Sequence, residues 1–443
     1  MRILKLRLLA VLTSVLVFSG IMAQINLQPD IQYYRLPGYS GLNVFETPKT
    51  TDITYDGFKV RLGGDFALQF QGLSHENAAN NLIEIGSNVN LPTANLNLDA
   101  QLMSGMRVHL RTYLSARHHN ESWVKGGYIQ VDRLDFISEG FAEGLMDVLS
   151  IRAGVDQINY GDAHFRRSDN AMAIYNPFVG NYIMDAFTTE PFIEANIMPG
   201  NFIAVVGLSN GLLNPTVVKT QTSRGTGMVT GTAENKVTFY GKLGWDNQIS
   251  NDLRVRLTGS FYNAPGYDNG NHLYGGDRAG GRYYKVFDFI KADSTVSSND
   301  FSARVNPRFS NEMAFQINPF VKFRGFEFFG IYEQTSGLNS PEGFDKGSYT
   351  QLGAELLYRF GSWEQFYVAG RYNSVSGNGQ FTSGTAAPEK MEVSRINIGA
   401  GWFMTKNTLV KLEYVTQEYN DQFGGALNAA KMNGVVLEAV IGF

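Results

Sequence analysis

Positively charged side chains recur at even spacing in several segments of the chain. Arg107 and Arg111 are four residues apart, and Arg254 and Arg256 are two apart. Because residues separated by two lie on the same face of a β-strand, each pair would line one surface. Arg and Lys side chains that face a narrow aqueous path raise the local concentration of anions. The candidates with this placement are Arg61, Arg107, Arg111, Arg254, Arg256, Lys322, Arg371 and Arg395.

Catalytic and metal-binding chemistry would need other groupings. A hydrolase needs a base beside a nucleophile, but His75 and the pair His118–His119 fall in expected loops, where an isolated polar residue is usually solvated. The chain contains no cysteine, and no spaced carboxylate completes a metal site beside the paired histidines. We therefore expect no enzyme activity, no cofactor, no metal and no nucleic-acid partner.

The elements that carry the basic residues have a period of two. In "FKVRLGGDFALQFQ", at 58–71, every second residue from Phe58 is apolar or glycine, and the residues between are mostly polar. The same alternation returns in "MRVHLRTYLSAR", "DLRVRLTGSFYN", "VSRINIGAGWFM" and "LVKLEYVTQ". It predicts β-strands with one apolar and one polar face. We find no comparable helical periodicity after the first residues of the chain.

The connections between these strands alternate between short and long. Short turns are expected at 104–105, 324–325 and 405–407, whereas about 30 residues follow Ile158 and about 25 follow Ser209. Short turns on one side and long loops on the other are typical of a bacterial outer-membrane barrel. Sixteen segments read as strands, and two weaker candidates lie near 282–291 and 301–309. The sequence thus predicts an all-β fold, a transmembrane antiparallel up-and-down β-barrel of 16 to 18 strands in the outer membrane, surrounded by lipid.

The two ends of the chain agree with this interpretation. Residues 1–23 combine a basic start, a short apolar stretch and small residues, the pattern of a secretory signal peptide. We expect residues 24–57 to form a periplasmic segment and residues 58–443 to form the barrel. The chain ends in "NGVVLEAVIGF", whose alternate residues up to Phe443 form one apolar face. A strand ending flush with an apolar boundary is predicted there.

The predicted barrel resembles a known family. The stretches "YGDAHFRRSDNAMAIYNPFVGNYIMDAFTTE", at 160–190, and "FQINPFVKFRGFEFFGIYE", at 315–333, look like the porin family of Bacteroidota outer membranes, akin to phosphate-selective porins. The resemblance implies passive diffusion of small hydrophilic solutes without cofactor or catalysis. It also implies that Phe443 belongs to a C-terminal signal for the barrel-assembly machinery.

Two questions stay open at this stage. A structural or secretion-associated barrel without a constitutive open pore would carry the same signal, alternation and terminal aromatic residue. The side chains that line the lumen distinguish the two functions, because a pore should have charged, hydrated walls. The polar face reads as wet and locally basic, which favours a porin with some preference for anions. The sequence leaves open whether the barrel forms a homotrimer.

The segment at 159–189 is too apolar for a freely exposed loop and too long for a turn. We expect it to fold into the lumen and to hold Arg166 and Arg167 at a constriction. Its anchors would be Tyr175, Phe178, Tyr182 and Phe187. The alternative is a loop packed over the rim or at a subunit contact, with the two arginines paired to Asp162 and Asp169.

Overall fold

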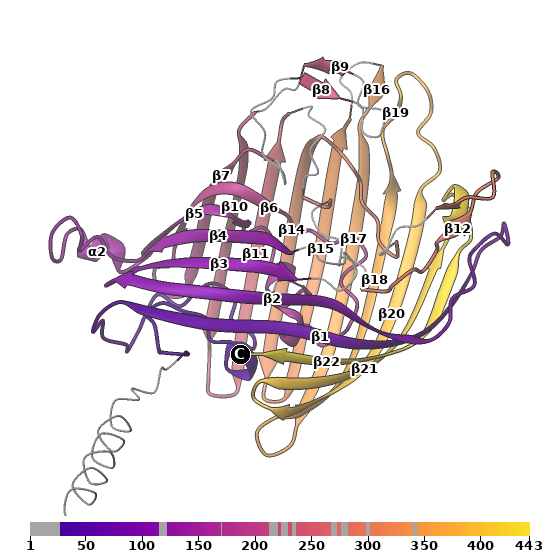
Figure 1. The fold of residues 1–443 in the computed structure, drawn as a ribbon. Helices are drawn as coiled ribbons and strands as arrows, with labels where there is room; N and C mark the ends of the chain where they lie inside the picture. The colour runs from indigo at the N-terminus through magenta and orange to yellow at the C-terminus, as the bar shows by residue number, and fades with distance from the viewer. Residues whose placement is uncertain are drawn as a thin grey trace, which may run out of the picture.

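The computed structural model describes residues 27–114, 122–169, 171–211, 220–222, 229–232, 236–266, 273–275, 282–297, 302–339 and 343–443. Within these ranges sixteen antiparallel strands close into one barrel, in chain order, and the last strand pairs with the first (Figure 1). The barrel strands are β1 (Lys59–Glu76), β2 (Asn88–Met103), β3 (Met106–Leu114), β4 (Ser122–Val131), β5 (Leu149–Gln157), β6 (Thr189–Ile197), β7 (Phe202–Ser209), β10 (Thr238–Gln248), β11 (Leu253–Ala264), β14 (Asn311–Phe323), β15 (Phe326–Leu338), β17 (Gly347–Phe360), β18 (Phe366–Asn378), β20 (Met391–Thr405), β21 (Thr408–Tyr419) and β22 (Lys431–Gly442).

The alternation in the sequence places the two faces of the wall as predicted. On β1, Leu68 and Phe70 are exposed on the outside, whereas Gln69 between them is fully buried on the inside. On β20 and β21, Ile398 and Leu412 are exposed in the same way. A closed barrel leaves no unpaired strand edge, which a bilayer could not satisfy. With its apolar outer face, the chain is a multi-pass β-barrel of the bacterial outer membrane.

The connections confirm two sides of different character, with one exception. The turns between β2 and β3 and between β14 and β15 have two residues each, whereas 31 residues, 158–188, join β5 to β6. The exception is the connection from β4 to β5 on the short side. It holds α2 (Glu143–Met146), which extends beyond the ends of these strands in Figure 1.

The two weaker strand candidates do not join the barrel. Within the described part of 282–309, the chain forms turns and one hairpin, β12 (Phe289–Ile290) with β13 (Val296–Ser297). The barrel therefore has 16 strands, not 18. Two other small sheets lie in the long loops. One is the hairpin of β8 (Thr220–Thr222) with β9 (Val229–Thr232), and the other pairs β16 (Phe344–Asp345) with β19 (Phe381–Thr382) from two different loops.

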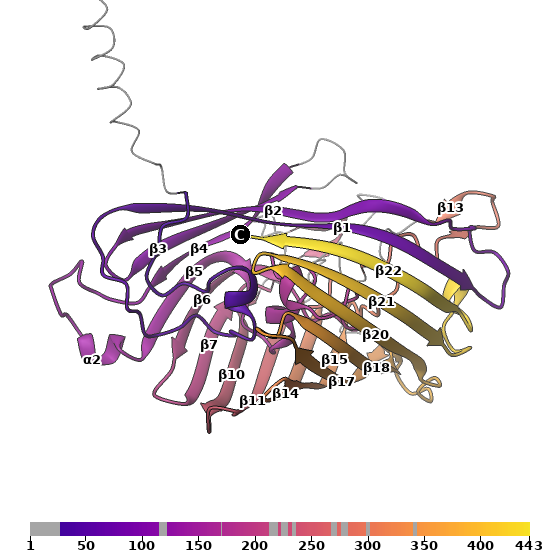
Figure 2. The same cartoon turned by 90° about the horizontal axis from the view of Figure 1, so that it is seen from below.

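Much of the barrel interior is occupied by three segments of the chain. The loop 158–188 carries η3 (Ala163–Arg166) and η4 (Ala173–Tyr175), and it is buried along nearly its whole described length. Residues 282–288, from the connection between β11 and β14, lie against it. The N-terminal segment, with η1 (Gly38–Gly41), crosses the mouth of the barrel in Figure 2. A last short helix, η5 (Gly425–Leu427), lies between β21 and β22.

The predicted signal peptide, at 1–23, lies outside the described residues. Among those that are described, no helix combines the length and apolarity required to traverse a membrane.

Candidate functional site

The loop 158–188 is fastened to the inner wall by backbone hydrogen bonds. The backbone N–H groups of Val179 and Gly180 donate to Glu413 Oε2 on β21, at 2.7 and 3.3 Å. On β18, Asn373 Oδ1 accepts the N–H of Ile183 at 2.7 Å. Loop backbone buried away from water must find such partners, and here the wall side chains supply them. The loop therefore lies inside the barrel and not over its rim.

The four aromatic residues expected to anchor the loop, Tyr175, Phe178, Tyr182 and Phe187, are all buried. Tyr182 donates its hydroxyl to Glu355 on β17 at 2.6 Å, and Tyr175 donates to the carbonyl of Leu36 at 3.1 Å. Phe178 has no exposed surface, and Phe187 has 3 %.

Arg166 and Arg167 are held in ion pairs. Arg166 Nη2 lies 3.0 Å from Glu355 Oε2 on the wall, and Arg167 Nη2 lies 2.9 Å from Asp185 Oδ2 within the loop. A second contact joins Arg167 to Asp169 at 3.4 Å, as the rim alternative had expected. Both arginines are at least nine-tenths buried.

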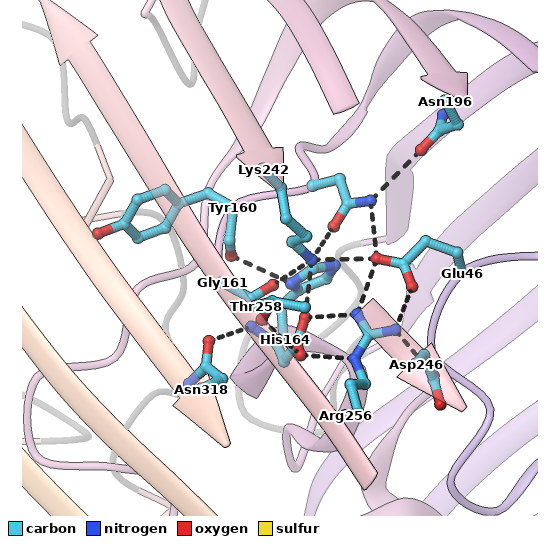
Figure 3. Close-up of polar contacts among 12 residues, drawn as sticks. Glu46, Tyr160, Gly161, His164, Asn196, Lys242, Asp246, Arg256, Thr258 and Asn318 are labelled. Carbon is cyan, nitrogen blue, oxygen red and sulfur yellow. Dashed lines mark hydrogen bonds and ion pairs between the residues drawn. The ribbon is translucent and has the colours of Figure 1, made fainter. Parts of the chain in front are cut away.

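A buried ionic cluster joins the loop, the wall and the N-terminal segment (Figure 3). Its members are Glu46, Asp162, Lys242 and Arg256, which we call the ionic clamp. Arg256 on β11 contacts Glu46 Oε2 at 2.8 Å and Asp162 Oδ2 at 2.8 Å. Lys242 Nζ on β10 reaches Asp162 Oδ1 at 2.8 Å and Glu46 Oε1 at 3.2 Å. Two cations and two carboxylates thus neutralise one another.

The clamp shifts the protonation of the groups around it. Burial alone would raise the pKa of Glu46, but the charges of Arg256 and Lys242 outweigh it and lower that pKa to about 2. The same two cations hold the pKa of Asp162 well below its usual range. Burial, followed by the charge of Lys242, lowers the pKa of His164 to about 3. Both carboxyls are therefore ionised and the imidazole is neutral at pH 7.

The N-terminal segment is attached to the barrel at further points. Gln32 accepts a hydrogen bond from Gln101 Nε2 at 2.7 Å, and Lys49 Nζ contacts Asp132 Oδ1 at 3.2 Å. Arg35 donates to the carbonyl of Gly41 and lies 3.9 Å from the ring centre of Tyr175 in the loop. The segment is thus part of the lumen structure.

A cavity of about 130 Å³, which we call the wall cavity, lies between the barrel strands β1 to β6 on one side and the loop 158–188 and the N-terminal segment on the other. Arg107, Arg111 and Arg152 line it from the wall. On the opposite side lie Phe165 and Met172 of the loop. Tyr34, Arg35 and Glu46 contribute from the N-terminal segment. This volume has room for several water molecules.

The wall arginines have acidic neighbours but keep unused donors. Arg107 Nη1 lies 3.4 Å from Asp99 Oδ1, Arg111 Nη1 3.5 Å from Asp156 Oδ1, and Arg152 Nη1 3.2 Å from Glu194 Oε1. Arg107 Nε and Arg152 Nε have no hydrogen-bond partner in the part of the chain that the structure describes, and the Arg111 contact is too long for a hydrogen bond. Tyr128 packs between two of these guanidinium groups, 4.2 Å from Arg152 and 5.4 Å from Arg107.

The ten basic residues expected at the pore do not form one lining. Arg107 and Arg111 line the wall cavity, and Arg61 donates to the carbonyls of Gln28 and Pro29 in the N-terminal segment. The other seven are paired elsewhere in the barrel. Arg256 belongs to the ionic clamp, and both Arg254 and Arg256 contact Asp246. Lys322 contacts Glu364, Arg371 contacts Glu355 and Asn176, and Arg395 donates to the carbonyls of Asn181 and Ala303. Arg166 and Arg167 form the ion pairs described above.

The structure corrects the expectation of a wet, basic lumen in one respect. Most of these basic groups are buried against acids or backbone carbonyls, because the loop and the N-terminal segment bring Asp162, Asp185 and Glu46 into the barrel.

Three residues that matter at the cavity were not recognised from the sequence. Arg152 lies in "LSIRAGVDQ", where it alternates with Ser150 and Gly154, so the period of two could have placed it on the inner face. Arg35 and Glu46 belong to an irregular segment without periodicity, and no local signal points to their partners.

Phe443 ends on the membrane-facing side of the wall. Its N–H and C=O both bond to Gly64 on β1 at 3.0 Å, and its side chain is 41 % exposed. Recognition of this residue by the assembly machinery stays a prediction.

The described histidines have structural contacts. His109 Nδ1 lies 2.9 Å from Asp99 Oδ1, His75 bonds to Ile83 and Phe287, and His164 bonds to the Tyr160 carbonyl. His118 and His119 fall outside the described residues. Across the described ranges, no group of three or more His, Asp or Glu side chains is arranged to hold a metal.

Comparison with known proteins identifies the fold. No family model matches the chain, and no curated protein sequence matches it. The outer membrane channel DcaP of Acinetobacter baumannii has a similar structure, with a TM-score of 0.51 at 10 % identity, covering 88 % of this chain and 99 % of that one. An anion-selective porin from Comamonas acidovorans has a TM-score of 0.48 at 12 % identity, covering 87 % and 100 %. At such low identity, the likeness to DcaP shows a shared barrel fold.

Proposed function

We propose that this protein is an outer-membrane porin through which small hydrophilic solutes diffuse passively. The observation that carries this proposal is the wall cavity, because it leaves a polar space between an inward-folded loop and a charged wall. A closed 16-stranded barrel is wide enough to hold such a path beside its internal loop. The shared fold with an outer-membrane channel is consistent with this function.

We further propose that the path prefers anions. Arg35, Arg107, Arg111 and Arg152 all line the wall cavity, against the carboxylates of Glu46, Asp65 and Asp156. Low-dielectric walls focus the field of such groups on a solute passing between them. Membership of the Bacteroidota porin family, assembly by the barrel-assembly machinery and a homotrimeric state belong to the same proposal.

A second candidate function is favoured by the filling of the lumen. The ionic clamp fixes the N-terminal segment across the barrel mouth, and a buried cluster of this kind does not open readily. A barrel closed in this way would be structural or secretion-associated, without a constitutive open pore.

Conductance of the purified protein in planar lipid bilayers distinguishes these two functions. A porin gives stable, open channels in potassium chloride at low voltage, and a salt gradient gives a reversal potential on the anion-selective side. Bilayers that stay silent, although the same preparation is folded by its heat-modifiable electrophoretic mobility, would contradict the porin and favour the closed barrel.

A further inference from the structure

Asp65 on β1 is a buried carboxylate without a hydrogen-bond partner among the described residues. Its side chain points inward and is 2 % exposed, yet neither carboxylate oxygen accepts a hydrogen bond within the described part of the chain. Asp65 lines the wall cavity, at the end of β1 where Gly442 and Phe443 of the last strand meet it. Leaving a buried carboxylate unpaired costs free energy, so such a group calls for a cationic partner.

The protein's own cations near Asp65 are engaged elsewhere. Arg282 and Lys411 are the basic residues that act on it electrostatically. Both ion-pair with Glu438: Lys411 Nζ lies 2.7 Å from Glu438 Oε1, and Arg282 contacts the other oxygen. Asp65 is thus left without an ion-pair partner among the described residues at the cavity wall.

The same cavity holds groups of the opposite charge at a defined spacing. Strand register pairs Asp65 with Asn95 on β2, and Asn97, the next inward residue of β2, with Arg111 on β3. Asp65 and Arg111 are therefore two strands and one inward row apart. Two strand spacings of about 4.8 Å each and an offset of about 6.8 Å along the strand place the two Cα atoms about 12 Å apart.

We propose that the wall cavity binds amphoteric solutes the size of a dipeptide. The ammonium group of the solute would bind the carboxylate of Asp65, and its carboxylate would bind the guanidinium of Arg111 and its neighbours. The charged ends of a dipeptide are one peptide unit further apart than those of an α-amino acid, which suits two groups that stand on different strands and in different rows of the wall. This inference rests on the proposed porin function and names the solute class of that path.

Three peptides that differ only in their end groups test this proposal. Glycylglycine carries both charges, N-acetylglycylglycine only the negative one, and glycylglycine amide only the positive one. Each is added to single channels in a planar bilayer, and the concentration that halves the potassium chloride current is measured. We expect glycylglycine to halve the current at a concentration about tenfold lower than either analogue, since each lost charge removes one charge-assisted hydrogen bond.

This order cannot arise from net charge alone, because a simple anion-selective path would favour the acetylated peptide over the neutral zwitterion. Equal block by all three peptides, strongest block by the acetylated one, or no block by any of them would overturn the inference while the channels themselves still support a porin. Absence of any channel would instead contradict the proposed function.

Asp65→Asn locates the ammonium site. In this variant, glycylglycine should lose its advantage over N-acetylglycylglycine, because the carboxylate that binds its ammonium group is gone. Asp252→Asn, a matched change at the exposed turn between β10 and β11, should keep the advantage. An unchanged peptide order in Asp65→Asn would remove this residue from the site. If Asp65→Asn fails to fold, the order of the three peptides on the parent protein still decides the inference.

Discussion

Arg256 Nη1 and Glu46 Oε2 lie 2.8 Å apart, although 210 residues separate the two in the sequence. This contact ties an irregular N-terminal segment to the barrel wall. Asp162 bonds to the same guanidinium, so the loop 158–188 is held at the same point. The loop and the N-terminal segment therefore meet at one cluster. Their release should change conduction more than any substitution on the barrel exterior.

Glu46→Gln should enlarge the channel. The change removes one charge from the clamp and leaves Arg256 and Lys242 with less compensation, and breaking a buried pair in this way costs about 3 kcal/mol or more. The charge that ties residues 44–47 to the wall is then lost, so this stretch should leave the cavity, while Gln32 and Lys49 keep their own contacts with the barrel. Single-channel conductance should rise, and residues 24–57 should become more sensitive to protease. Glu389→Gln, in an exposed loop, serves as the control, and equal conductance of the two variants would contradict a gating role for the clamp.

Arg111→Glu should shift ion selectivity, whereas Arg166→Glu should not. Arg111 lines the wall cavity with an unused donor, so reversing its charge should lower the chloride-to-potassium permeability ratio severalfold, because screening is weak in a narrow passage. Arg166 is paired with Glu355 and does not line this cavity, so its reversal should chiefly destabilise the loop. Reversal potentials in a salt gradient measure both. A larger shift from Arg166→Glu than from Arg111→Glu would restore Arg166 to the constriction.

The barrel wall could be predicted from the sequence because its signal is local. The alternation of apolar and polar residues around Leu68 and Leu412 indicates which side chains face lipid. The lengths of the connections indicate at which end of the barrel each connection lies. The prediction of a barrel strand at 282–291 is wrong. Its apolar residues pack against the other lumen segments, and burial in a protein interior produces the same composition as a lipid-facing strand.

The interior contacts could not be predicted because they are non-local. Nothing near Glu46 in the sequence indicates Arg256, and nothing near Asp162 indicates Lys242. The inward fold of the loop could be expected, since an apolar segment of that length must pack somewhere. Which arginines would stay available to solutes depended on where each acid of the loop came to lie, and that position is set by the closed fold.

His164 should make the loop sensitive to mild acid. Its pKa is lowered to about 3 in the folded protein, mainly by burial, against about 6.5 in the unfolded chain. The unfolded state therefore takes up a proton first, so stability is constant above pH 6.5 and falls as the pH drops toward 3. The loss is roughly 1.4 kcal/mol per pH unit for one such group.

Urea unfolding of detergent-solubilised protein at pH 7.5, 6.5 and 5 measures this loss. Glu46 contributes only below its usual value of 4.5, down to about 2, so it does not titrate between pH 6.5 and 5. Comparison of His164→Gln with the parent over this interval gives the contribution of His164. His164→Gln should reduce the fall in stability between pH 6.5 and 5. A variant that loses as much stability as the parent over that interval would show that another group titrates.

Gly64→Leu should impair assembly of the barrel in the same manner as Phe443→Asp. A side chain at Gly64 would meet the ring of Phe443 at 2.9 Å, closer than carbon atoms can approach, so the ring must leave its place over β1. If the outward position of this ring forms part of the assembly signal, both variants should lower the yield of folded, heat-modifiable protein in outer membranes. Gly370→Leu is a matched control, because Gly370 on β18 has open space where a Cβ would lie. Normal yields for Gly64→Leu and Phe443→Asp together would show that the terminal ring is not read during assembly.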